Sequence, residues 1–381
     1  MNHQEPSVDE KLKAILNARA DDLTLRRLEQ NGHLVDFASN DYLGLARSAE
    51  LRRITDESYA KYTQFAHGAT GSRLISGNHK LYEELEHFVA DYHQAEAGLI
   101  FNSGYDANVG FFSAVPQPGD IVYADELVHA SIRDGLKMTR AACSYFSHND
   151  LIDLETQMQK HEGNKFIAVE SIYSMDGDFA PLLELVELAE KYGANLVVDE
   201  AHATGIFGPK GEGRVVQLGL QNRVYARVHT FGKALGGHGA VVLGSRVLRE
   251  FLINFARSFI YTTALPLYSL LWVKNAYDIL SKGCYKELEI RFLINLLQEN
   301  LKGLSGAVMS SNEGPIQSLI IPGNGRAKQV SAALAQAGFY AKAILYPTVP
   351  RGKERLRICV HQFNTTEEVL GLCNTIKAAL A

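Results

Sequence analysis

The feature that most constrains the fold is an alternation of short apolar runs with amphipathic stretches through the middle of the chain. The apolar runs have the length of strands buried on both faces, and they occupy residues 98–101, 120–123, 166–169, 196–198 and 239–243. Between two of these runs, residues 181–192 carry one helical face made of Leu182, Leu185, Val186 and Ala189. Strands that alternate with helices predict an α/β fold in which a mostly parallel sheet is covered by helices on both faces.

Segments with other patterns flank this region. Ser7 and Glu10 have the spacing of a capping box, and apolar residues then recur at roughly helical intervals at Leu12, Ile15, Leu16, Leu23 and Leu28. We therefore expect a helical N-terminal arm over residues 1–45 and a large domain over 46–275. The alternation breaks down near residues 261–271, so a smaller C-terminal α+β domain is predicted for 276–381, ending in a helix capped at 365–368.

Composition excludes several kinds of partner. With 381 residues, 46% of them hydrophobic, the chain can bury a large core. Its net charge of -5 leaves no basic surplus for a nucleic acid. No C-x-x-C pair occurs among the four cysteines, so neither a metal site nor a disulfide framework is expected from Cys143, Cys284, Cys359 and Cys373. Apolar segments stay short of the roughly 20 residues of a membrane span, so we expect a cytoplasmic protein with no membrane partner.

Functional residues of an open α/β sheet are sought beyond the carboxyl ends of the strands. Asp199 directly follows the predicted strand at 196–198, and Lys233 closes the segment 230–233, which we interpret as another strand end. A lysine can form a Schiff base with pyridoxal phosphate, and an aspartate can keep the pyridine nitrogen of that cofactor protonated. His202, three residues after Asp199, can reach the same ligand. Each residue also has an ordinary alternative role: Asp199 can be a helix cap, and Lys233 can be a solvated surface charge.

Two further strand ends offer a phosphate site and a stacking residue. Ser103, Gly104 and Tyr105 stand between a predicted strand and a helix, where free N–H groups receive an anion. A simple turn is the alternative role. Thr230 supplies a hydroxyl three residues before Lys233. We expect the ring of His129 to stack on the cofactor, although a lone histidine is more often structural.

Nine motifs in sequence order resemble the α-oxoamine synthases. These are pyridoxal phosphate enzymes of the aspartate aminotransferase fold (fold type I), which join an amino acid to an acyl thioester and release carbon dioxide. The resemblance runs from about residue 10 to the end of the chain. It is carried by NDYLGLA (40–46), GATGSRLISGNHKLYEELE (68–86), FNSGYDANVG (101–110), DELVHASIRDG (125–135), SIYSMDGDFAPL (171–182), VDEAHATGIFGPKGEGR (198–214), HTFGKALGGHGA (229–240), IYTTALP (260–266) and PTVPRGKERLRI (347–358).

The resemblance implies a role for each matching residue. Lys233 becomes the Schiff-base lysine, Asp199 the partner of the pyridine nitrogen, His202 the donor to the phenolic oxygen and His129 the stacking residue. The remaining cofactor contacts it implies are Ser103, Gly104, Tyr105, Ser174 and Thr230, together with Thr262 and Thr263 from the neighbouring subunit of a homodimer with shared active sites. Arg357 is the expected clamp for the amino-acid carboxylate, because a planar guanidinium matches a carboxylate, and Asn40 and Thr348 are expected beside the substrate.

Within the family, four branches differ in their substrates. They use alanine with a pimeloyl thioester, glycine with acetyl-CoA, glycine with succinyl-CoA, or serine with a palmitoyl thioester. The segments GSRLISGN, SIYSMDGDFAPL, FARSFIYTTALP and GPIQSLII are most similar to the first branch, with CoA or an acyl carrier protein as the carrier. The chain departs from some members of that branch at Leu345, where those members carry an arginine. The role of that arginine therefore cannot be transferred to this chain. A plain aminotransferase and a non-catalytic regulator are the alternatives outside the family.

Overall fold

The computed structural model describes residues 6–63, 67–283, 287–310 and 312–381. By their contacts, the residues group into two compact units. The large unit comprises Asn40–Ser174 and Asp178–Glu287, and the small unit falls within Met1–Ser39, Met175–Gly177 and Leu288–Ala381. Each unit is described by itself, and the expected division at residues 45 and 275 stays a prediction.

A seven-stranded sheet in the order β2-β8-β7-β6-β5-β3-β4 forms the centre of the large unit. Only β8 runs antiparallel to its neighbours β2 and β7, and every other pair is parallel. The expected mostly parallel sheet is therefore confirmed. The strands are β2 (Ala97–Phe101), β3 (Ile121–Asp125), β4 (Ala142–Phe146), β5 (Lys165–Glu170), β6 (Ala194–Asp199), β7 (Ala226–Thr230) and β8 (Ala240–Gly244).

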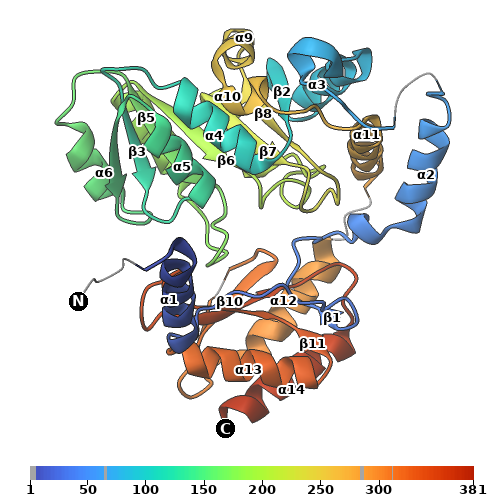
Figure 1. Ribbon diagram of the computed structural model, residues 1–381, viewed down its shortest axis with the longest axis vertical. Coiled ribbons are helices and arrows are strands. Elements are labelled where there is room, and N and C mark those ends of the chain that lie inside the picture. The colour runs from blue at the N-terminus through green and yellow to red at the C-terminus, as the bar shows by residue number, and fades with distance from the viewer. Residues whose placement is uncertain (1–5, 64–66, 284–286, 311) are drawn as a thin grey trace. The chain divides into compact units, whose positions relative to one another are not determined.

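Helices cover both faces of this sheet because alternate residues of its central strands point to opposite sides. On β5, Phe166 and Ala168 pack with α4 and α5 on one face, whereas Ile167 and Val169 pack with α6 and α7 on the other. Figure 1 shows α4 and α5 lying together over one face of the sheet. The α-helices of the large unit are α2 (Ala49–Tyr59), α3 (Lys80–Tyr92), α4 (Gly104–Ala114), α5 (Ala130–Met138), α6 (Leu151–Met158), α7 (Leu182–Lys191), α8 (Arg214–Gln217), α9 (Arg246–Phe255), α10 (Arg257–Ile260) and α11 (Leu267–Ser281).

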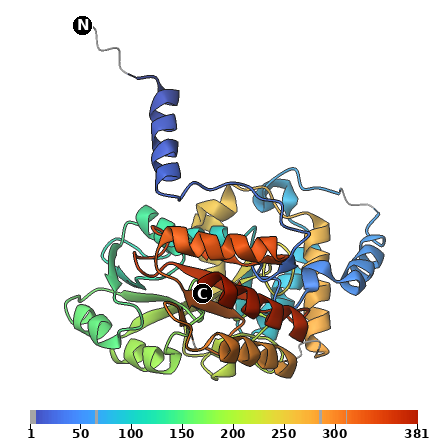
Figure 2. The ribbon, with the colours of Figure 1, turned by 90° about the horizontal axis from the view of Figure 1, so that it is seen from below.

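The small unit contains two sheets and helices α1 and α12 to α14. Its four-stranded antiparallel sheet has the order β12-β13-β10-β9, and β1 pairs in parallel with β11. Helices α13 and α14 lie side by side in Figure 2. The elements are α1 (Val8–Asp21), β1 (Val35–Asp36), α12 (Glu287–Leu301), β9 (Val308–Met309), β10 (Ile316–Ile320), α13 (Asn324–Gln336), β11 (Phe339–Tyr340), β12 (Lys342–Ile344), β13 (Arg355–Cys359) and α14 (Thr366–Leu380).

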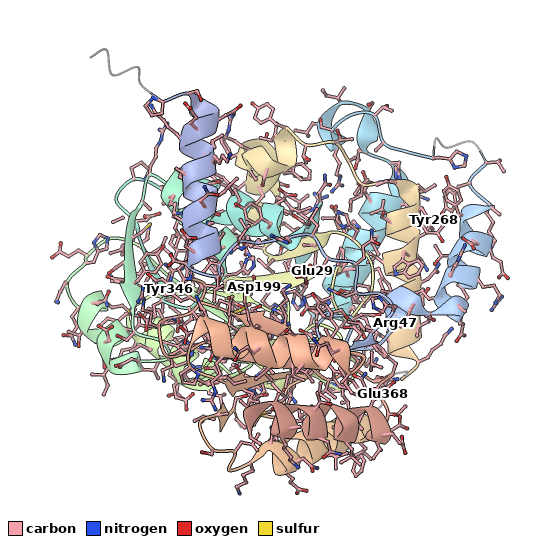
Figure 3. All side chains as sticks on the ribbon, turned by 60° about the horizontal axis from the view of Figure 1, so that its bottom comes forward. Glu29, Arg47, Asp199, Tyr268, Tyr346 and Glu368 are labelled. Carbon is pink, nitrogen blue, oxygen red and sulfur yellow. The ribbon has the colours of Figure 1, made fainter. Side chains whose placement is uncertain are left out.

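Both predicted capping boxes are present, and one helix is shorter than its apolar pattern suggested. Ser7 and Glu10 cap α1, while Thr365 and Glu368, the latter labelled in Figure 3, cap α14. Helix α1 ends at Asp21, so Leu23 and Leu28 lie outside the helix whose pattern they were predicted to continue. The backbone φ of Leu23 is 59°, in the left-handed region, so the helix does not continue through this residue. No helix of the described residues is long and apolar enough to cross a membrane.

Candidate active site

Lys233 begins a chain of hydrogen bonds that runs into the core of the large unit. Its Nζ lies 2.8 Å from Nε2 of His202, and Nδ1 of His202 lies 2.7 Å from the hydroxyl of Tyr42. That hydroxyl donates to Oδ1 of Asn40 at 3.1 Å. The bonds are consistent if Lys233 donates to Nε2 and the Nδ1–H of His202 donates to Tyr42. The expected donation by His202 to a cofactor oxygen stays a prediction, and through Nε2 it requires a proton on that nitrogen.

Asp199 ends β6 at the carboxyl edge of the sheet, and Figure 3 labels it. Its side chain is 7% exposed and accepts hydrogen bonds from Nδ2 of Asn108 at 2.7 Å and from the N–H of Ala201 at 2.8 Å. Both donors are neutral, and within the described ranges no Lys, Arg or His pairs with this carboxylate at ion-pair distance. Because a buried carboxylate normally has a cationic partner, this arrangement fits a ligand that brings a protonated nitrogen.

His129 is connected to Asp199 through two side chains. Its Nδ1 lies 2.7 Å from the hydroxyl of Ser131, and Nδ2 of Asn108 reaches that hydroxyl at 3.0 Å as well as Asp199. Desolvation lowers the pKa of His129; the charge of Asp199 opposes this shift and that of Lys233 adds to it. An imidazole that is neutral at pH 7 and exposed to solvent suits stacking on a flat ligand.

The start of α4 is the place where the sequence predicts an anion site, and that role stays a prediction. Ser103 is the N-cap, its hydroxyl accepts from the N–H of Asp106, and Gly104 and Tyr105 open the helix. A Cβ atom added to Gly104 would lie 3.5 Å from Oγ1 of Thr230, so this hydroxyl stands next to the first turn. The phenol of Tyr105 donates to Asp134 instead, at 2.8 Å. Tyr105 can therefore contribute to anion binding through its backbone N–H.

Thr262 lies near the start of α4 within the same chain. Nδ2 of Asn102, the residue before Ser103, donates to Oγ1 of Thr262 at 3.0 Å and to the carbonyl of Thr263 at 2.5 Å. The side chain of Thr263 is exposed. The expectation that a neighbouring subunit supplies Thr262 and Thr263 stays a prediction.

The large unit thus holds all of the residues expected to bind the cofactor, together with Asn40. Arg357 and Thr348 belong to the small unit. There, Arg357 lies on β13, is 7% exposed and directs Nη1 toward Sγ of Cys359 at 2.9 Å. Thr348 is exposed, and its N–H donates to the carbonyl of Leu345 at 2.9 Å. Their expected roles at the substrate stay predictions.

Comparisons with known proteins decide the family. The family model described as aminotransferase class I and II matches residues 32–376. The chain belongs to this family. An 8-amino-7-oxononanoate synthase of Emericella nidulans is 44% identical over 393 residues, covering 96% of this chain and 94% of that protein.

Two solved structures share the fold of this family. A serine palmitoyltransferase from S. paucimobilis with a bound PLP–myriocin aldimine has a TM-score of 0.89 and 25% identity, with 98% of each chain covered. An 8-amino-7-oxononanoate synthase from Francisella tularensis has a TM-score of 0.77 and 27% identity, with 91% of this chain and 97% of that chain covered. The expected aspartate aminotransferase-like fold and the resemblance to the α-oxoamine synthases are confirmed.

Two residues of this aminotransferase-family site were missed by the sequence reasoning. Tyr42 is fully buried and hydrogen-bonds to His202, and Asn108 hydrogen-bonds to Asp199. Both lie inside motifs that carried the resemblance, NDYLGLA and FNSGYDANVG. Their place in these motifs was the signal that could have identified both residues. They were missed because neither side chain carries an obvious reactive group.

A histidine outside the expected set stabilises two loops at the site edge. His148 lies between Oδ1 of Asp125 at 3.0 Å and Oδ2 of Asp178 at 2.6 Å. Burial alone would lower the pKa of His148, but the hydrogen bonds and negative charges of the two aspartates raise the pKa to about 10. His148 is therefore charged at neutral pH and links the loops that follow β3 and β5.

We expect His148→Gln to lower the free energy of unfolding by about 2 kcal/mol near pH 6.5. A raised pKa stabilises the fold fully below the unfolded value near 6.5, and this stabilisation is lost as the pH rises through about 10. Urea unfolding at several pH values should show the variant and the native chain converging toward pH 10. His33→Gln, at an exposed position, serves as the control. A gap that widens between pH 7 and 10 would refute the assigned charge.

Proposed function

We propose that this chain is a pyridoxal phosphate-dependent acyltransferase of the 8-amino-7-oxononanoate synthase type. Two features of the large unit carry the proposal: the Lys233 amine beside His202, and the buried Asp199 carboxylate. That carboxylate accepts from the neutral Asn108 amide and the Ala201 N–H and has no ion-pair partner among the described residues. The 44% identity with an 8-amino-7-oxononanoate synthase over nearly the whole chain supports the same conclusion. The start of α4, with Thr230 beside it, offers N–H groups and a hydroxyl that suit a phosphate.

The cofactor, when bound, supplies an electron-withdrawing ring that delocalises a carbanion beside it. Asp199 would hold the proton on the ring nitrogen, and His129 would stack on the ring. Lys233 would provide the amine that holds the cofactor, and once the amino group of the substrate has displaced it, the freed amine would take the Cα proton as general base. His202 and Tyr42 hold the amine of Lys233 in place through the hydrogen-bond chain that ends at Asn40.

The proposed substrates are L-alanine and a pimeloyl thioester of CoA or an acyl carrier protein. The products are 8-amino-7-oxononanoate, carbon dioxide and the free thiol, which places the reaction in biotin biosynthesis. In this proposal Arg357 binds the amino-acid carboxylate, with Asn40 and Thr348 beside the substrate. Alanine differs from glycine by one methyl group, and an apolar pocket discriminates between such substrates by only about 1–3 kcal/mol. We therefore expect some activity with glycine.

We further propose that the chain acts as a cytoplasmic homodimer with shared active sites. Thr262 and Thr263 of each subunit would then contact the cofactor phosphate in the neighbouring site. Two-fold symmetric dimers are the commonest homo-oligomers of soluble proteins. The family resemblance at residues 260–266 is the other support, and the proposed partner is a second copy of this chain.

The experiment that tests the substrate proposal is a panel of amino acids and acyl donors. We expect kcat/KM to be highest for alanine with the pimeloyl thioester, compared with acetyl, succinyl and palmitoyl thioesters and with glycine and serine. Mass spectrometry of the product identifies the ketone formed, and detection of pyruvate would reveal plain transamination. A preference for glycine with acetyl-CoA would replace the proposal with 2-amino-3-ketobutyrate CoA ligase, and one for serine with the palmitoyl donor would replace it with serine palmitoyltransferase.

A further inference from the structure

Ser318 is a buried residue of the small unit to which the function proposed above assigns no role. It lies on β10, and only 1% of it is exposed. Its Oγ is buried and has no hydrogen-bond partner among the described residues. The large majority of buried hydroxyl groups have a partner, because leaving one unpaired costs free energy. A ligand that accepts a hydrogen bond from Ser318 would remove that cost.

The strand register places Ser318 directly opposite Arg357. The Cα atoms of the two residues are partners in the antiparallel pairing of β10 with β13. Side chains of such a pair leave the sheet on the same face, with Cβ atoms about 4.5–5.5 Å apart. The hydroxyl and the guanidinium both donate hydrogen bonds, and a carboxylate accepts several of them. One carboxylate can therefore bind to both residues at once.

Other cations on this face of the sheet already bind carboxylates. Arg355 lies on the same face as Arg357, because residues two positions apart in a strand share a face. Lys342 on β12 is the partner of Arg357 on its other side. Arg355 forms an ion pair with Asp176, and Nζ of Lys342 lies 2.9 Å from the carboxylate of Glu29. This face of the sheet is thus suited to carboxylates.

The same face contacts the segment that follows a predicted site residue. Nη1 of Arg355 hydrogen-bonds to the carboxylate of Asp176 and donates to the carbonyl of Met175 at 3.5 Å. By their contacts, both partners belong to the small unit, and they directly follow Ser174, an expected cofactor contact. Ser318 therefore lies on the face of the sheet that this part of the site borders.

We propose that Ser318 is a substrate-binding residue, whose hydroxyl donates a hydrogen bond to the carboxylate of the amino-acid substrate beside Arg357. The inference rests on the proposed function, which takes an α-amino acid and assigns its carboxylate to Arg357. A hydrogen bond to a carboxylate is charge-assisted and stronger than one between neutral groups. Ser318 and Arg357 together therefore select free amino acids over amino-acid amides, which have no negative charge.

The first test measures amino-acid binding to the full-length, cofactor-loaded Ser318→Ala variant. Absorbance titration with L-alanine gives the dissociation constant, which should be about tenfold higher than in the native protein. Alaninamide keeps the amino and methyl groups of alanine but has no carboxylate. Its dissociation constant should change by less than about twofold, because a bond to a neutral amide contributes less.

Thermal unfolding without cofactor separates a binding role from a structural one. Ser318→Ala removes a hydroxyl that has no partner in the protein, so the Tm should not fall. Ser331→Ala is the matched control, because the Oγ of Ser331 on α13 donates to the carbonyl of Ala341 at 2.8 Å. This control should lower the Tm by about 2 °C and leave the affinity for alanine unchanged.

The outcomes separate the inference from the proposed function. A dissociation constant for alanine within twofold of the native value, or an equal loss for alanine and alaninamide, overturns the role of Ser318. A fall in Tm as large as that of Ser331→Ala would show a structural hydroxyl and overturn it as well. If alanine causes no absorbance change in the native protein, the proposed substrate is wrong, and glycine and serine replace alanine in the same comparison with their amides.

Discussion

Lys233→Ala should lower the rate of the alanine and pimeloyl thioester reaction by about 10⁴-fold or more. The substitution removes the amine that lies 2.8 Å from His202 and leaves no other lysine in the described site to attach the cofactor or take the Cα proton. The fold should be retained, because Lys233 is only partly buried and sits at a turn after β7. Steady-state kinetics with product detection by mass spectrometry, together with circular dichroism, measures both expectations.

The matched control is Lys80→Ala, which removes a lysine side chain that is 86% exposed at the start of α3. Its kcat and KM should equal those of the native enzyme. A Lys233→Ala variant that retains a tenth of native turnover would show that another group carries the chemistry.

Asp199→Asn should be the second most damaging substitution, with a loss of about 10³-fold or more in kcat/KM. The change is nearly isosteric, but a neutral amide no longer stabilises a proton on the ring nitrogen. The variant should fold, since the amide of Asn108 can rotate and offer its buried, unpartnered Oδ1 to the new NH₂ group. The comparison is made from kcat/KM values and thermal unfolding curves.

Asp199→Glu is the companion variant, because it keeps the charge and moves it by one methylene. It should retain more activity than Asp199→Asn at equal thermal stability. If Asp199→Asn keeps activity within tenfold of the native value, the carboxylate does not act on the ring nitrogen.

The sequence predicted the elements that obey simple patterns and missed those that depend on tertiary contacts. The five apolar runs correspond to β2, β3, β5, β6 and β8, because strands buried on both faces are apolar throughout. Strand β7 was not among them, since it contains Arg227 and His229. Both are buried, and their hydrogen-bond partners lie far away in the sequence, among them the carbonyl of His93 for Arg227 and the hydroxyl of Thr204 for His229.

The candidate site likewise contains residues that the sequence identified and residues that only tertiary contacts reveal. Asp199, His202 and Lys233 could be singled out because each carries a reactive group at a strand end. Tyr42 could not, because its task is to orient His202 across 160 positions of sequence. Asn108 could not be singled out either, because its partner Asp199 lies 91 positions further along the sequence.

Reductive labelling shows which residue holds the cofactor, for which we propose Lys233. The purified protein is incubated with pyridoxal phosphate, reduced with borohydride, digested and mapped by mass spectrometry. We expect one pyridoxyl group per chain, on the peptide that contains Lys233, and none on that peptide in Lys233→Ala. A pyridoxyl group found mainly on another lysine of the native chain would contradict the assignment of the site.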